Sequence, residues 1–184
     1  MDGMFNGCSG LTSLDLSGFD TSKVTNMNSM FQSCSSLIEI KGIEDFNVNL
    51  VSNFTSIFSN TKLTVLDLST WTPSNYTNNW AWGYAFSITT LTSLDLSSAN
   101  FANLTDLNNM FASAASLVSF NPPINIVGSL KLNETKLDTE SLIKVINNLA
   151  TVTTTQTLKL GTKNLAKLTE DQIAIAVNKG WTVA

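Results

Sequence analysis

A short motif that ends in phenylalanine recurs along the first 120 residues, and it constrains the fold more than any other feature of the sequence. Its copies follow one another every 25 to 28 residues, at Met4-Phe5, Met30-Phe31, Ile57-Phe58, Ala85-Phe86 and Met110-Phe111. A leucine-containing step follows each copy, and three copies continue into an identical Leu-Asp-Leu-Ser, which starts at Leu14, Leu66 and Leu94. Repeats of this length fold as successive units that pack mainly on their neighbours.

The spacing of apolar residues within one copy predicts its local structure. Side chains alternate along Leu14–Ser17, so Leu14 and Leu16 face inward and Asp15 faces outward, as in a strand. The segment from Val24 to Phe31 has the spacing of one or two helical or 3₁₀ turns with a single buried side. Because a ~25-residue period with a Leu-x-x-Leu-x-Leu core is typical of leucine-rich repeats, we expect an α/β fold. The expected architecture is a leucine-rich repeat solenoid, in which each ~26-residue coil adds one short strand to a parallel sheet.

The regular spacing ends after Asn121-Pro122-Pro123, and the remaining chain predicts a helical C-terminal cap. One predicted helix begins at Asp138 or Thr139 as its N-cap. A second begins with a capping box at Thr169 and stops at Gly180. Short strands are expected at Ser129–Asn133, Thr157–Gly161 and Trp181–Val183.

These boundaries predict one continuous domain. Residues 1–133 form about five repeats, the first of them incomplete, and residues 134–184 form a capping region with two short helices and a polar outer surface. Because the first repeat begins midway, we expect either a longer protein or end-to-end self-association through an uncapped N-terminal coil.

The composition excludes several classes of function. The chain contains no His and no Arg, ten Lys, and a net charge of −4. Without His there is no His-based triad or His metal site, and an acidic chain without Arg is not typical of nucleic-acid binding. No apolar run reaches the ~18 residues of a membrane span, and the first ten residues lack the pattern of a signal peptide. We therefore expect no enzyme activity, no metal and no cofactor.

The two cysteines occupy one repeated position, three residues after the phenylalanine. Its occupants are all small: Cys8, Cys34, Thr61, Thr89 and Ala114. This pattern favours a buried slot that fits small side chains. Stacked coils lie ~4.8 Å apart, so a Cys8–Cys34 disulfide stays open as an alternative.

The first candidate site is a pair of carboxylates on the outward side of the strands. The predicted column of outward residues runs through Asp15, Lys41, Asp67, Asp95, Asn121, Lys131 and Lys159. Asp67 and Asp95 are neighbours in it, and adjacent carboxylates can serve glycoside hydrolysis or bind calcium. A solvated polar face of the repeat is the favoured interpretation, and the same exposed sheet is the expected docking surface.

The second candidate site is an irregular segment rich in aromatic residues. The segment from Trp71 to Phe86 is three residues longer than its counterpart from Phe19 to Phe31. Trp71 and Tyr76 align with core positions, which leaves a set of three aromatics as candidate ligand contacts: Trp80, Trp82 and Tyr84. The alternative is that these side chains fill an enlarged gap in the core.

The repeat resembles the BspA-like leucine-rich repeat family. Residues 4–30 match its pattern, including Phe-Asp-Thr-Ser-Lys-Val-Thr-Asn-Met at 19–27, and the likeness extends over residues 1–120 and more weakly over 121–133. The closing residues 164–184 are similar to the ends of such proteins. The resemblance implies an extracellular or cell-surface bacterial protein that adheres to a host or neighbour-cell protein or glycan. A structural spacer or assembly segment of a longer protein, with no ligand of its own, is the alternative.

Overall fold

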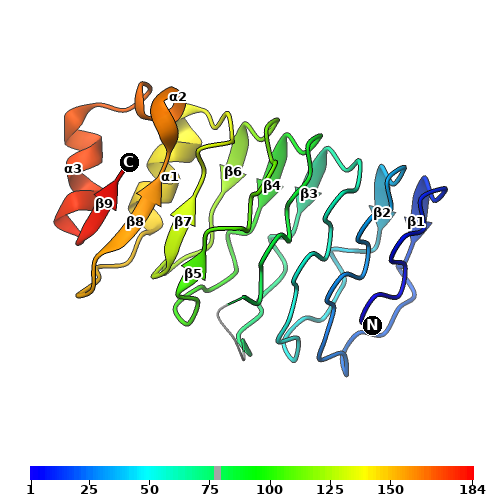
Figure 1. Ribbon diagram of the computed structural model, residues 1–184. Helices are drawn as coiled ribbons and strands as arrows, with labels where there is room; N and C mark the ends of the chain where they lie inside the picture. The colour runs from blue at the N-terminus through cyan, green and yellow to red at the C-terminus, as the bar shows by residue number, and fades with distance from the viewer. Residues whose placement is uncertain (77–79) are drawn as a thin grey trace.

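The computed structural model describes residues 1–76 and 80–184 as a mixed α/β fold with parallel strands and few helices (Figure 1). The strands are short: β1 Ser13–Asp15, β2 Glu39–Lys41, β3 Val65–Asp67, β4 Ser93–Asp95, β5 Asp106–Leu107, β6 Ser119–Asn121, β7 Ser129–Lys131, β8 Gln156–Lys159 and β9 Trp181–Val183. The helices follow the repeats: α1 Thr139–Asn148, α2 Gly161–Leu165 and α3 Glu170–Asn178.

Two rows of backbone run across the molecule (Figure 1). The first, here called the strand row, consists of β1 paired with β2, and of β3, β4 and β6 paired in that order, all parallel. The second, the return row, joins the segments that contain the repeated phenylalanines, through bonds such as Phe31 N–H to the Ile57 carbonyl at 2.9 Å. It ends in the parallel sheet β5-β7-β8-β9. Successive turns of the chain therefore lie side by side, with the core between the rows.

The core confirms most of the repeat positions that the sequence predicts. The predicted small-residue slot is buried at Cys34, Thr61 and Ala114 but exposed at Cys8 and Thr89. Phe31 and Phe58 stack with ring centroids 5.6 Å apart, and Phe5, Phe86 and Phe111 extend this column on either side. Met27, Met30 and Cys34 are fully buried, as are Trp71 and the leucines of the later strands. Burial of a methylene contributes about 0.8 kcal/mol, so the large apolar side chains of this shared column stabilise the fold.

The cysteine slot gives a prediction about thiol reactivity. Both thiols are free; Cys8 is exposed, whereas Cys34 is buried and its Sγ donates to the Phe5 carbonyl at 3.0 Å. Burial raises the pKa of the Cys34 thiol, which disfavours the reactive thiolate. We expect one thiol to react rapidly with Ellman's reagent at pH 8, and both after unfolding in guanidinium. Two fast thiols would contradict the packing, and none in native or unfolded protein would indicate a disulfide.

The placement of β7 and β8 differs from the prediction. Both segments form strands as expected, and Lys131 and Lys159 are partners in their pairing. However, β7 pairs with β5 in the return row, where Leu130 lies opposite Leu107. Lys131 and Lys159 therefore do not continue the column of Asp67, Asp95 and Asn121. The sequence predicts one strand in each turn, but the turn that contains β5 and β6 has two.

Helix α1 explains this change of row, because it occupies the place beside β6. The Phe120 N–H donates to Ser141 Oγ at 2.9 Å, and the Asp138 N–H donates to the Val118 carbonyl. Pro122 and Pro123, directly after β6, have no N–H to offer another strand. The edge of β6 is thus covered by the helix, and the next strand joins the return row.

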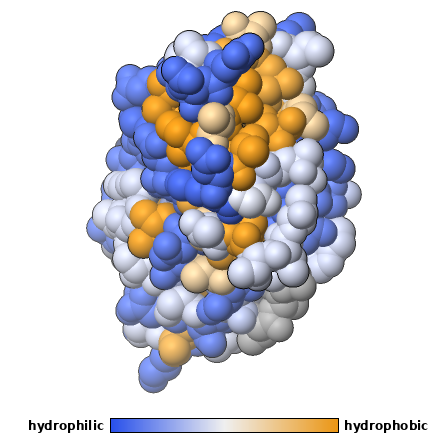
Figure 2. Space-filling view, turned by 90° about the vertical axis from the view of Figure 1, so that its left-hand side faces the viewer, coloured by the Kyte–Doolittle hydropathy of each residue, from blue (hydrophilic) through white to orange (hydrophobic). Residues whose placement is uncertain are grey.

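The C-terminal helices combine predicted and additional features. Asp138 caps α1 through the Ser141 N–H, and Thr169 and Gln172 form the predicted capping box of α3. The five-residue α2 is an addition to the two helices predicted. The outer surface of this end is not the expected polar lid: Figure 2 views it directly, and apolar residues gather in its upper part. Ile175 and Val177 of α3 are exposed.

Candidate functional site

The aspartates of the strand row have a local structural role. Asp67 accepts the Ser69 N–H at 3.0 Å, and Asp95 accepts the Ser97 N–H at 2.9 Å and the Ser97 hydroxyl at 2.6 Å. Asp15 makes the same contacts to Ser17. A carboxylate that bonds the N–H two residues on stabilises a tight turn. The Leu-Asp-Leu-Ser consensus therefore encodes the turn that ends each strand.

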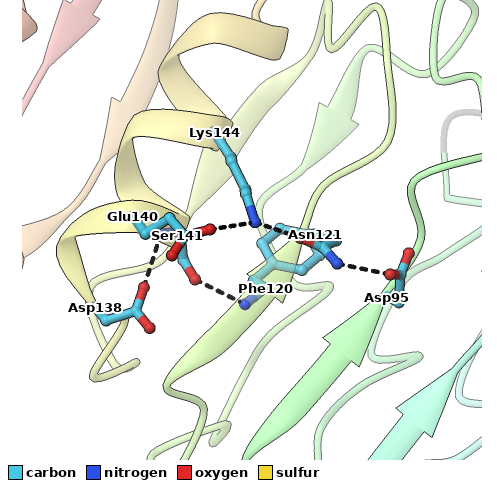
Figure 3. Close-up of polar contacts among 7 residues, drawn as sticks. All are labelled: Asp95, Phe120, Asn121, Asp138, Glu140, Ser141 and Lys144. Atoms are coloured by element: carbon cyan, nitrogen blue, oxygen red, sulfur yellow. Dashed lines mark hydrogen bonds and ion pairs between the residues drawn. The ribbon is translucent and has the colours of Figure 1, made fainter.

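Asp95 also joins a polar network that reaches α1 (Figure 3). Its Oδ2 accepts from Asn121 Nδ2 at 2.6 Å, and Asn121 Oδ1 accepts from Lys144 Nζ at 2.9 Å. Lys144 forms an ion pair with Glu140 one helical turn earlier, at 2.8 Å. The network ties the last strand of the row to the helix that covers it. Asp67 is the partner of Asp95 across the strands, but none of these side-chain bonds reaches it.

These contacts keep Asp95 ionised. Partial burial raises its pKa, but the bonds from Ser97 and Asn121 and the charge of Lys144 outweigh this effect, so the pKa lies below its ordinary value. A general acid in glycoside hydrolysis needs a raised pKa. Asp95 is therefore better suited to support the turn and sheet than to act as a general acid.

The lowered pKa of Asp95 predicts a pH dependence of stability. Because the folded-state pKa lies below the unfolded value of about 4, Asp95 stabilises the fold above that value. The contribution is lost as pH falls through the folded-state pKa. We expect Asp95→Asn to lower the free energy of unfolding by about 1 kcal/mol at pH 7, and by less at pH 2. Urea unfolding at both pH values measures this, and an equal loss at both would contradict it.

The structure separates the three aromatic candidates. Trp82 is 1% exposed, and its ring stacks on Phe54 with centroids 4.3 Å apart. It is therefore a core residue, as the alternative in the sequence analysis proposes, and is removed from the candidate surface. Trp80 and Tyr84 are about half exposed, at 52% and 44%. Residues 77–79 of the irregular segment lie outside the described residues.

The backbone explains how Trp80 and Tyr84 are presented. Tyr84 has a φ of 57°, in the left-handed region, and Ser29 and Ser56 at the corresponding turn of earlier copies also have a left-handed φ. The Tyr84 N–H donates to the Asn109 carbonyl. The Trp80 carbonyl accepts from the Thr55 hydroxyl at 2.7 Å. Both residues thus lie on the return row, whereas Asp67 and Asp95 lie on the strand row. The structure does not bring the two candidate groups together.

A cleft that the sequence analysis missed lies where the strand row is interrupted. Strands β2 and β3 belong to separate sheets, and a cavity of about 420 Å³ opens beside them. This β2–β3 cleft is lined by Ile38, Glu39, Ile40, Ile43, Glu44, Leu63, Val65, Leu66, Asp67, Ser69 and Thr70. Such a volume lies within the range typical of ligand pockets.

A local departure from the repeat lies beside the cleft. The second copy reads Ile-Lys-Gly-Ile over 40–43 instead of Leu-Asp-Leu-Ser, so Gly42 replaces the second leucine. Gly42 has a φ of 76°, and a Cβ on it would lie 2.4 Å from the Ser17 backbone. The end of β2 is thus held close against β1. The motif change is visible in the sequence, but the gap on the other side is not.

The described residues contain no cluster of His, Cys, Asp and Glu that could hold a metal ion. In the same part of the chain, no helix has the length and hydropathy needed to cross a bilayer. The exposed features are an apolar cleft with an acidic rim on one row and two aromatic side chains on the other. Both are chemically suited to contact another molecule.

Comparison with known proteins identifies a family but no function. Residues 1–126 match the model of a family described as Mycoplasma protein of unknown function, DUF285. No curated protein and no solved structure matches the chain. The match spans the repeats and stops shortly before β7. Because it covers more than half of the 184 residues, the chain belongs to the DUF285 family.

Proposed function

We propose that the protein is a non-enzymatic binding module whose repeats form a leucine-rich repeat solenoid. The parallel registers, in which Leu66 lies opposite Leu94 and Leu94 opposite Phe120, support the repeat assignment. The observation that carries the binding function is the β2–β3 cleft, an apolar depression in an otherwise hydrogen-bonded strand row. Interruptions of a regular scaffold are where binding residues concentrate.

The resemblance to BspA-like repeats supports an adhesive role at a bacterial surface, with a protein or glycan of a host or neighbouring cell as the partner. Binding of the purified chain to glycan and peptide arrays tests this proposal. Val65→Asp changes the cleft, and Trp80→Ala changes the aromatic pair; both residues are more than half exposed, so the fold is retained. Loss of binding in either variant locates the site. Absence of any array binding would contradict the proposal.

A spacer or assembly role is the second candidate, and the apolar ends of the molecule favour it. Met4 is 50% and Phe19 40% exposed in the first repeat, and Ile175 and Val177 of α3 are exposed at the other end of the chain. Contact between such ends would extend the stack from copy to copy. Sedimentation velocity tests this role: a mass that rises with concentration, and is reduced by Phe19→Ser and Val177→Ser, supports it. A concentration-independent monomer would contradict self-association.

A further inference from the structure

The β2–β3 cleft exposes hydrogen-bonding groups of a strand edge. Just after β3, the Leu68 N–H donates to the Asp95 carbonyl, and just before it, the Thr64 carbonyl accepts from the Thr92 N–H. The backbone groups of the even-numbered residues therefore face β4. Alternate residues of a strand direct their backbone groups to opposite sides, which turns those of Val65 and Asp67 toward β2.

Within residues 1–76 and 80–184, no strand pairs with β3 on that side. In the regular turns, the residue after the strand makes a backbone hydrogen bond to the next turn. The Leu16 N–H donates to the Lys41 carbonyl, and the Leu96 N–H donates to the Asn121 carbonyl. Among the described residues, Gly42 makes no such bond to Asp67. The two turns meet again beyond the gap, where the Thr70 hydroxyl donates to the Glu44 carbonyl at 2.6 Å. The free edge is therefore short and local, about the three-residue length of β3.

The side chains around this edge define the chemistry of an occupant. Ile38 and Val65 are 61% and 60% exposed and provide apolar contact. Glu39, Glu44 and Asp67 also line the cleft, and its lining among the described residues includes no Lys. The nearby Lys41 is the partner of Asp15 in the pairing of β1 with β2. The hydrogen bonds from Ser17 are the main cause of the lowered pKa of the Asp15 carboxyl, and the charge of Lys41 lowers it further. The cleft thus complements a chain with aliphatic surface and positive charge.

We propose that the β2–β3 cleft binds an extended, lysine- or arginine-bearing segment of a partner protein, which adds a strand to the free edge of β3. Main-chain hydrogen bonds supply affinity in this mode of recognition, and side chains supply specificity. The carboxylates of the rim select positive charge and repel acidic segments. This inference rests on the proposed binding function and names the class of partner that it requires.

Titration with synthetic pentapeptides tests the proposal directly. The first probe is acetyl-Lys-Val-Lys-Val-Lys-amide, the second replaces lysine with glutamate, and the third keeps lysine but carries N-methyl groups on both valines. At a fixed ionic strength of ~0.15 M, we expect the lysine peptide to bind at least about tenfold more tightly than either of the others. Equal binding of the lysine and glutamate peptides would overturn the charge selection, and equal binding of the N-methylated peptide would overturn strand addition.

Matched double variants locate the peptide. Glu39→Lys with Glu44→Lys reverses the charge of the cleft, and we expect it to weaken binding of the lysine peptide about tenfold. Glu134→Lys with Glu170→Lys makes the same change of net charge elsewhere, and binding should stay at the level of the unmodified protein. All four residues are exposed, so circular dichroism should be unchanged. If an array partner binds both double variants equally, the binding function stands and the cleft is not its site.

Discussion

Replacing Trp82 with alanine is expected to lower the free energy of unfolding by about 3–5 kcal/mol, the range for a large aromatic removed from a packed core. Trp82 lies between Phe54 and Phe86, with centroids 4.3 and 5.6 Å away, and also contacts Phe101. Its loss opens a cavity that neighbouring turns cannot fill without shifting the stack. Urea unfolding followed by circular dichroism measures the change.

Trp80→Ala is the matched control, since it removes the same side chain two residues away. Trp80 is 52% exposed, so we expect a loss below about 1 kcal/mol. Similar losses for the two variants would contradict the assignment of one tryptophan to the core and the other to the surface. The pair also separates stability from binding, because only Trp80 is placed to contact a ligand.

Gly42→Ala is expected to lower the free energy of unfolding by about 2–5 kcal/mol. A side chain in the left-handed region costs about 1–2 kcal/mol, and forcing a methyl group against packed atoms costs a further 1–3. The added Cβ would lie 2.4 Å from both the Cα and the N of Ser17, which are backbone atoms and cannot turn away as a flexible side chain can. The variant should also move the end of β2 away from β1.

Gly18→Ala provides the comparison for this effect. A Cβ at Gly18 meets no atom within 4 Å, and its φ does not lie in the left-handed region. Its free energy of unfolding should stay within about 0.5 kcal/mol of the unmodified protein. If Gly42→Ala proved equally mild, the close contact between β1 and β2 would not be required for the fold.

The repeat positions were predictable because one set of contacts recurs in every turn. Phe31 and Met30 have buried counterparts in every later copy, so their burial follows from the spacing. The spacing alone does not fix burial at the first copy, where Met4 is 50% exposed and Cys8 is exposed. The helix caps at Asp138 and Thr169 were predictable for a related reason, since a cap depends on residues within one turn of helix. Local and periodic interactions therefore appear in the sequence directly.

The row that each C-terminal strand joins was not predictable from its own residues. The Ser-Leu-Lys of β7 matches the alternation of the Ser-Leu-Asp in β4, yet α1 covers β6 and directs β7 to the return row. Trp82 was misplaced for a similar reason: its burial depends on Phe54 from the preceding turn, not on the composition of its own segment. The β2–β3 cleft likewise lies beside a non-local contact, that of Gly42 with Ser17, whose positions are 25 residues apart.

Amide hydrogen exchange along β3 tests the central claim, that the strand row is interrupted beside β2 and leaves a free edge. We predict fast exchange at Val65 and Asp67 and slow exchange at Leu66 and Leu68, which face β4 on the same strand. Addition of the lysine peptide should slow exchange at Val65 and Asp67. Protection of these two amides equal to that of Leu66 and Leu68 in the free protein would show a continuous row and contradict the account.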